Sequence, residues 1–202
     1  MIFPELTDTS RGLWLRPWLT PGPVPPNVEL CLEWTALPDR TVGSFDRIYW
    51  QEPGYFRGDR KAVCAALAAR LAPTGSLTIQ TRLSPSTRLR GRPARETQAA
   101  ADYLNAFHAL LEPGAAPAVG QPVWEKWLAA AGLEIASFAT EDIETELAYR
   151  PEHTPADRLR LRALLQQAPA PARQRLTPTV ADARILFHVY QATIICRLKA
   201  HE

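Results

Sequence analysis

The chain has 202 residues and a formal net charge of +2. That length allows one domain with a substantial core, and the near-neutral charge excludes a protein whose overall field would attract nucleic acid or a membrane surface. The three cysteines form no CxxC pair, which favours free core thiols in a reducing compartment. No signal-peptide pattern and no apolar run of membrane-spanning length occurs, so we expect a cytoplasmic protein.

Residues 1–27 form a segment rich in proline and tryptophan. Proline cannot donate to a sheet ladder, so this segment predicts at most one short strand followed by an extended linker. Its tryptophans, Trp14 and Trp18, are expected either to cover the core or to insert into a partner chain. Residues 28–202 are predicted to form a single α/β domain with a helical insertion at about 93–131.

The stretch from residue 44 to residue 81 carries the clearest local signals. Residues 45–50 are aromatic and β-branched, which predicts a strand. Asp59 suits the N-cap of a helix over 61–71, because its carboxylate can accept hydrogen bonds from the free amides of the first turn. Residues 73–75 should end that helix, and a second strand begins at about 77–79. Strand, helix and strand over this length predict a βαβ unit with parallel strands.

Hydrophobic periodicity predicts the elements further along the chain. One helix carries a pronounced apolar stripe, and another has Gly132 as its stop signal. The last segment is strongly β-prone and is predicted to be a closing antiparallel strand. The predicted helices cover residues 96–111, 122–131, 154–167 and a short stretch after Pro171, and the predicted strands cover residues 28–34, 133–138 and 185–198.

Two short motifs carry a resemblance to a known family. The sequence SFDRI at 44–48 and the sequence LAPTG at 71–75 resemble the fourth strand and the L-x-P-G-G turn of class I S-adenosylmethionine-dependent methyltransferases. Residues 101–107 and the pattern from Trp124 to Leu133 are similar to elements of ubiquinone/menaquinone-type members. The resemblance implies a Rossmann-like α/β fold, in which a mostly parallel sheet with an antiparallel C-terminal strand is flanked by helices.

The resemblance also implies a donor site that this sequence carries only in part. The family has a glycine-rich turn after its first strand, but only Gly12 and Gly22 precede Glu33 here. There is no room for the strand–helix–strand–helix block that should hold this turn, so we expect an N-terminally truncated sheet. The isolated chain is then expected to bind no cofactor. If an S-adenosylmethionine site is retained, Glu33, Gln51 and Tyr55 would line it.

The truncation leads to our first functional hypothesis. Missing strands would leave the edge of strand 45–50 open, and an open edge must be paired or covered. Residues 28–34 could pair with it, or two chains could join there as a homodimer. The chain would then be a methyltransferase-like protein that is non-catalytic alone and acts through self-association or a partner chain.

Two other functions remain open. One is an active methyltransferase with a rebuilt or shared cofactor site, and the other is a small-molecule binding protein that uses the helices around Tyr103, Phe107 and Trp124. We assign no catalytic residue, and the four histidines show no metal-ligand spacing. His108 is interpreted as a structural residue of its helix. The arginine-rich stretch 82–95 is interpreted as a solvated loop, which makes nucleic acid an unlikely partner.

Overall fold

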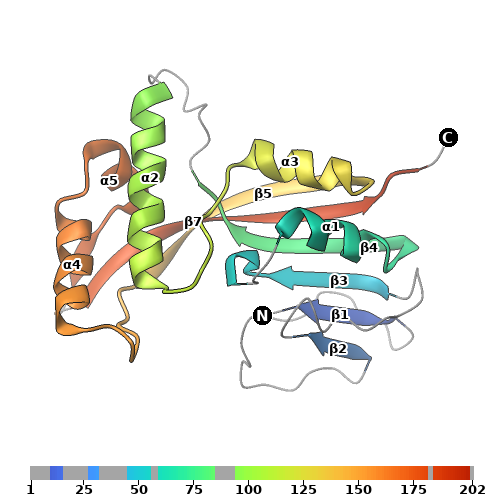
Figure 1. Cartoon of the computed structure of the whole chain (residues 1–202), viewed down its shortest axis with the longest axis horizontal. Coiled ribbons are helices and arrows are strands. Elements are labelled where there is room, and N and C mark those ends of the chain that lie inside the picture. The colour runs from blue at the N-terminus through green and yellow to red at the C-terminus, as the bar shows by residue number, and fades with distance from the viewer. Residues whose placement is uncertain are drawn as a thin grey trace. The chain divides into compact units, whose positions relative to one another are not determined.

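The computed structural model describes residues 10–15, 27–31, 45–55, 59–84, 94–181 and 184–200. The described strands form a sheet in the order β2-β1-β3-β4-β7-β5, with β6 paired to β7 (Figure 1). The strands are β1 (Gly12–Leu15), β2 (Val28–Cys31), β3 (Phe45–Gln51), β4 (Leu71–Arg82), β5 (Leu133–Glu146), β6 (Thr179–Ala181) and β7 (Arg184–Leu198), and the helices are α1 (Arg60–Ala68), α2 (Ala94–Leu111), α3 (Gln121–Ala130), α4 (Pro155–Gln166), α5 (Ala170–Leu176) and the 3-10 turn η2 (Pro53–Tyr55).

The chain divides into two compact units. Unit 1 comprises Met1–Thr81, Val123–Ala139 and Ala192–Glu202, and unit 2 comprises Arg82–Pro122 and Thr140–Gln191. Unit 1 therefore holds α1 and all of α3 except its first two residues, whereas unit 2 holds α2, α4 and α5. Strands β5 and β7 contribute residues to both units. No helix of the described residues is long and apolar enough to span a bilayer.

The sheet confirms the predicted α/β class. Strands β1, β2, β3 and β4 pair in parallel, and β6 pairs with β7 in antiparallel fashion. The arrows of β3 and β7 point in opposite directions in Figure 1, as expected for an antiparallel C-terminal strand.

The arrangement around β1 differs from the sequence-based expectation. Strand β1 lies between β2 and β3, with Leu13 opposite Ile48 and Leu15 opposite Trp50. The expectation that residues 28–34 could pair with strand 45–50 was therefore wrong, because β2 pairs with β1 instead. Strand β3 has neighbours on both sides, so it is not an open edge of the sheet.

The predicted βαβ unit is present as β3, α1 and β4. Asp59 caps α1 as expected, since its Oδ1 accepts a hydrogen bond from the Lys61 amide at 2.9 Å. The helix ends at Ala68, earlier than predicted, and residues 73–75 lie inside β4 rather than terminating the helix. There the register jumps, from Phe45 opposite Leu71 to Arg47 opposite Ser76.

The close surroundings of residue 75 explain why the L-x-P-x-G motif ends in glycine. A Cβ at this position would lie 3.0 Å from the Asp46 carbonyl oxygen on β3 and 2.9 Å from Leu71 Cδ1. Those separations are too short for a side chain, so glycine permits the close backbone approach at the irregular start of β4.

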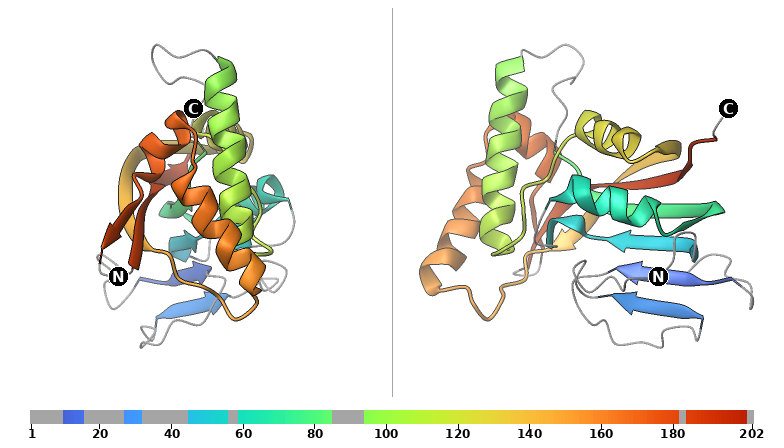
Figure 2. Two further views of the ribbon diagram at one scale, coloured as in Figure 1. Left: turned by 90° about the vertical axis from the view of Figure 1, so that its left-hand side faces the viewer. Right: turned by 45° about the vertical axis from the view of Figure 1, so that its right-hand side comes forward.

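Side chains alternate between the two faces of the unit 1 sheet. On one face, Ile48 and Trp50 of β3 are buried at 1% and 0% exposure. Trp50 contacts Trp124 of α3, and the Arg60 guanidinium of α1 lies 5.2 Å from the ring centroid of Trp127 on α3. Figure 2 shows α1 and α3 on the same side of β3 and β4. We call this side the helix-covered face.

Unit 2 has its own core, in which Phe107 of α2 meets Phe187 of β7 edge to face with centroids 5.3 Å apart. Helix α4 begins with a capping box, because Thr154 and Asp157 exchange side-chain to backbone hydrogen bonds. Residues of α2, α4, α5 and β7 complete this core together with two residues outside these elements, Leu147 after β5 and Ala168 between α4 and α5. The other members are Leu104, Leu111, Leu161, Leu165, Ala172, Leu176 and Ile185.

Candidate functional site

The strand order of unit 1 identifies one location as a candidate ligand site. From β1 the chain moves to β2 on one side, whereas β3 and β4 lie on the other side of β1. In open parallel sheets, ligands bind beyond the carboxyl ends of the strands at such a switch point. Here that point lies at the ends of β1 and β3, next to Leu15 and Gln51.

The structure places two of the three predicted donor-site residues at this point. Gln51 ends β3 and donates a hydrogen bond from its Nε2 to Gln80 Oε1 at 3.3 Å. Tyr55 ends η2, directly after the strand, and its amide donates to the Glu52 carbonyl at 3.1 Å. Glu33 lies outside the described residues. Gln51 and Tyr55 are thus close in sequence at the end of β3, and the amide of Gln51 is already engaged.

The backbone at the end of β3 is strained. Glu52 has a φ of +48°, a left-handed conformation that is uncommon for residues other than glycine. Its amide donates to the Gln80 carbonyl on β4 at 2.8 Å, which holds the turn into η2. Such strain is concentrated at functional sites in proteins, so this turn is a feature of the candidate site that sequence patterns did not indicate.

The second face of the unit 1 sheet differs from the helix-covered face. Tyr49 Oη donates to Gln80 Oε1 at 3.2 Å, and the ring of Trp14 meets the ring of Tyr49 at a centroid distance of 6.5 Å. Burial raises the pKa of Tyr49 above its usual value. We call this side the polar face; its described residues on the central strands are Trp14, Arg47, Tyr49, Gln51, Ser76, Thr78 and Gln80.

The polar face has no helix among the described residues of unit 1. The helices of that unit are α1, α3 and the 3-10 turn η2, and both α-helices pack on the opposite side. Parallel sheets are ordinarily covered by helices on both faces. Tyr49, Gln51 and Thr78 on this face are half-buried.

The aromatic residues of the predicted substrate-side helices are used for packing within their units. In unit 2, Phe107 is fully buried and Tyr103 Oη donates to the Leu164 carbonyl at 2.7 Å. In unit 1, Trp124 is fully buried against Trp50. These three side chains therefore take part in the packing of their own units.

The histidines of unit 2 have different environments. His153 is satisfied on both ring nitrogens, because Nδ1 accepts from the Arg150 amide at 2.9 Å and Nε2 lies 3.0 Å from the Leu110 carbonyl. His108 and His188 come from α2 and β7 and line one small cavity together. No sequence motif indicates that His108 and His188 line the same cavity, because the two residues are far apart along the chain. In the described part of the chain, no three His, Cys, Asp or Glu residues are grouped as metal ligands would be.

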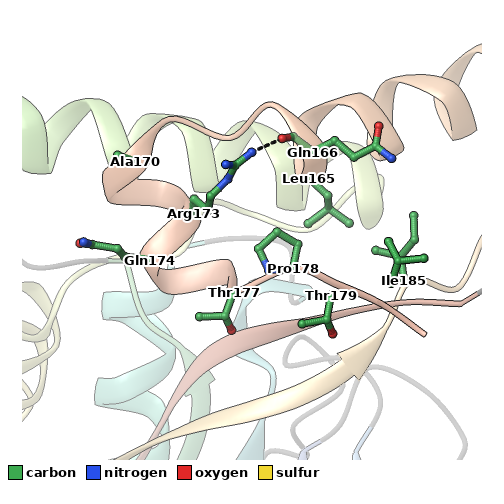
Figure 3. A pocket seen from close by; sticks show the side chains of 10 residues that line it. Leu165, Gln166, Ala170, Arg173, Gln174, Thr177, Pro178, Thr179 and Ile185 are labelled. Atoms are coloured by element: carbon green, nitrogen blue, oxygen red, sulfur yellow. Dashed lines mark hydrogen bonds between the residues drawn. The ribbon is translucent and has the colours of Figure 1, made fainter.

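Unit 2 also contains a larger groove of about 570 Å³ between α4, α5 and β6 (Figure 3). Its walls include the apolar side chains of Leu165 and Ile185, and the Arg173 guanidinium at its rim donates to the Gln166 carbonyl. Thr177, with a φ of +35°, forms the turn between α5 and β6. Neither the motifs nor the periodicity of the sequence indicated this groove.

A mostly parallel sheet with this strand order and these flanking helices is the fold of class I S-adenosylmethionine-dependent methyltransferases, in agreement with the sequence resemblance. No protein-family model and no curated protein matches the sequence. The likeness is found among solved structures.

Three of those structures illustrate it. The YcgJ protein from Bacillus subtilis superposes with a TM-score of 0.70 at 16% identity, covering 87% of this chain and 73% of its own. A candidate methyltransferase from Bacillus halodurans has the same TM-score and coverages at 15% identity. The Haloferax volcanii complex between the Trm112 methyltransferase activator and a candidate methyltransferase gives a TM-score of 0.51 at 12% identity, covering 96% and 73%. At these identities the likeness establishes the fold.

Proposed function

We propose that this chain is a methyltransferase-fold protein that does not bind the methyl donor alone and acts by association through the polar face of unit 1. The observation that carries the proposal is the position of α1 and α3, which both cover the same side of the sheet. Covering the polar face with a second chain would supply the layer that parallel sheets normally have.

The end of β1 supports the first part of this proposal, which is that the chain alone does not bind the methyl donor. In the family that the sequence resembles, the first strand ends in a glycine-rich turn, which lets the backbone approach the cofactor. Here β1 ends at Leu15, and Arg16 and Pro17 follow in the sequence. Neither Arg16 nor Pro17 is a glycine, so the sequence lacks here the residue type on which that close backbone approach depends.

The comparison structures support the second part of the proposal, which is association with another chain. The chain covers 73% of YcgJ, so more than a quarter of that protein has no counterpart here. The Haloferax volcanii structure is itself a complex of a methyltransferase-fold protein with an activator chain. We propose that this chain likewise meets another chain, and that the simplest candidate is a second copy of itself.

Two measurements test the proposal. Isothermal titration of the purified chain with S-adenosylmethionine should show no binding, and micromolar affinity would contradict the proposal. Sedimentation velocity should show a dimer that dissociates in the Thr78→Arg variant, because Thr78 lies on the polar face. Lys126→Glu on the exposed side of α3 is the matched control and should leave the dimer intact. A wild-type monomer at all concentrations would overturn self-association.

The second candidate function is an active methyltransferase with a rebuilt donor site. The observation that favours it is the strained turn at Glu52 beside Gln51 and Tyr55, at the switch point of the sheet. In that case the titration would detect S-adenosylmethionine, and Gln51→Ala would weaken its binding. Ser76→Ala, at the other end of the polar face, would leave the affinity unchanged.

A further inference from the structure

A small cavity inside unit 2 has the side chains of a ligand site. It measures about 20 Å³, which is enough for one water-sized atom. Together with the open space at its mouth, it contains about 350 Å³ free of protein atoms. Helices α2 and α5, strand β7 and the residues after β4 contribute its polar lining, which consists of Ser84, Asn105, His108, Arg175, His188 and Tyr190.

His108 brings an unpaired polar atom to this cavity. Its Nδ1 is buried and has no hydrogen-bond partner among the described residues. Burial, together with the positive charge of Arg82, lowers the pKa of His108 to about 3, so the ring is neutral at physiological pH. A buried polar atom without a partner is costly, and a bound atom in the adjoining cavity would remove that cost.

The hydrogen bonds of the neighbouring side chains determine which lining groups can contact a ligand. His188 Nδ1 is hydrogen-bonded to Thr177 Oγ1, which fixes the orientation of the imidazole at the cavity. Both polar atoms of the Asn105 amide are engaged with the backbone of Ala118, so Asn105 shapes the wall. His108 and His188 are thus the two imidazoles that can meet a ligand.

The charge of the lining selects for an anion. The Arg175 guanidinium lies 4.5 Å from the ring centroid of Tyr190, which holds this cation at the cavity. None of the described residues that line the cavity carries a carboxylate. Glu112, the acid on the following turn of the chain, pairs with Arg82 and Arg150. A site with a cation, imidazoles and hydroxyl groups, and no acid, matches the hydrogen-bonding needs of a carboxylate.

We infer that this cavity binds a small carboxylate, with its leading oxygen in the space between His108 and His188 and its charge matched by Arg175. A single carboxylate oxygen fits the enclosed volume, and the rest of the molecule lies at the mouth. The site lies wholly within unit 2, so it stands whether or not unit 1 binds S-adenosylmethionine or a second chain.

Acetate is the probe that tests this site. In histidine-labelled full-length protein, NMR should show saturable shifts of the His108 and His188 ring signals on titration with acetate at constant pH and ionic strength. His153, whose two nitrogens are already bonded, should not shift. Acetamide, which has the same shape without the charge, should bind at least tenfold more weakly. Unchanged signals, parallel shifts of His153, or equal binding of acetamide would overturn the inference.

Variants on α5 separate the site from general charge effects. Arg175→Met should weaken acetate binding about tenfold or more, because it removes a charged hydrogen-bond donor. Arg173→Met, on the same helix but at the groove of Figure 3, should leave binding unchanged. His188→Gln provides a second test if Arg175→Met does not fold, and it should also weaken binding. Wild-type affinity in folded Arg175→Met or His188→Gln would overturn the assignment.

Discussion

The indole rings of Trp50 and Trp124 meet edge to face, with their centroids 5.9 Å apart. Trp50 lies on β3 and Trp124 on α3, and both are at 0% exposure. Edge-to-face geometry adds to the hydrophobic contribution of two large buried rings. This contact therefore attaches α3 to the helix-covered face of unit 1.

Replacing Trp124 should be among the most damaging single changes in unit 1. Trp124→Ala should lower the free energy of unfolding by about 3–5 kcal/mol, because it leaves a large cavity against Trp50. Urea denaturation followed by fluorescence measures the loss. Trp127→Ala on the same helix is the control, and it should cost clearly less because Trp127 is only half-buried. Equal losses for the two variants would contradict the packing described here.

Gly75 is predicted to tolerate no side chain. Gly75→Ala would place a Cβ 3.0 Å from two backbone carbonyl oxygens, Ala72 and Asp46, neither of which can rotate away. We expect a loss of about 1–3 kcal/mol, as in other overpacked sites. Chemical denaturation measures it, with the adjacent exposed Thr74→Ala as a control near zero. A stabilised Gly75→Ala variant would show that β3 and β4 are less closely apposed.

The cap of α4 can be tested at Thr154. Thr154→Ala should cost about 1 kcal/mol of stability, because the first turn of α4 loses its side-chain acceptor. The hydrogen bonds from Thr154 lower the pKa of Asp157, so the same change should raise that pKa toward its ordinary value. NMR titration of Asp157 measures the shift. Thr140→Ala, on the exposed part of β5, should change neither quantity.

His108 should make the protein sensitive to acid. Its pKa is about 3 in the folded protein and near 6.5 when unfolded, so the unfolded chain binds the proton first. The stability that depends on neutral His108 is therefore complete above about pH 6.5, falls as the pH drops below it, and is fully lost near pH 3. Denaturation at a series of pH values measures this slope. His108→Gln should flatten it, and an unchanged slope would show that other groups cause it.

The sequence predicted best where the determinants are local. The start of α1 was predictable from Asp59, because the Asp59 carboxylate accepts a hydrogen bond from the backbone amide of Lys61, only two residues further along the chain. The position of β1 was not predictable in this way. Its four residues carry little pattern, and their place between β2 and β3 depends on register with strands elsewhere in the chain. The length of β5 was underestimated, because its acidic second half lacks the apolar alternation by which strands are recognised.

The candidate site was predictable only in part for the same reason. Gln51 and Tyr55 could be placed because they follow a recognisable strand. The approach of His108 to His188 results from the packing of α2 against α5 and β7 within unit 2, and no motif records it. Local sequence patterns also did not predict that the described helices α1 and α3 cover the same face of unit 1 (Figure 2), because this depends on how each helix packs on the sheet.

Unit 1 is assembled from three separate stretches of the chain, and this has a consequence for how the protein folds. Strand β4 has β7 as its second neighbour, and the part of β7 in unit 1 follows all of unit 2 in the sequence. During synthesis, the edge of β4 that pairs with β7 therefore stays unpaired until more than a hundred further residues have been added. Long loops must close before the sheet is complete, which slows folding and leaves the edge of β4 exposed to aggregation in the meantime.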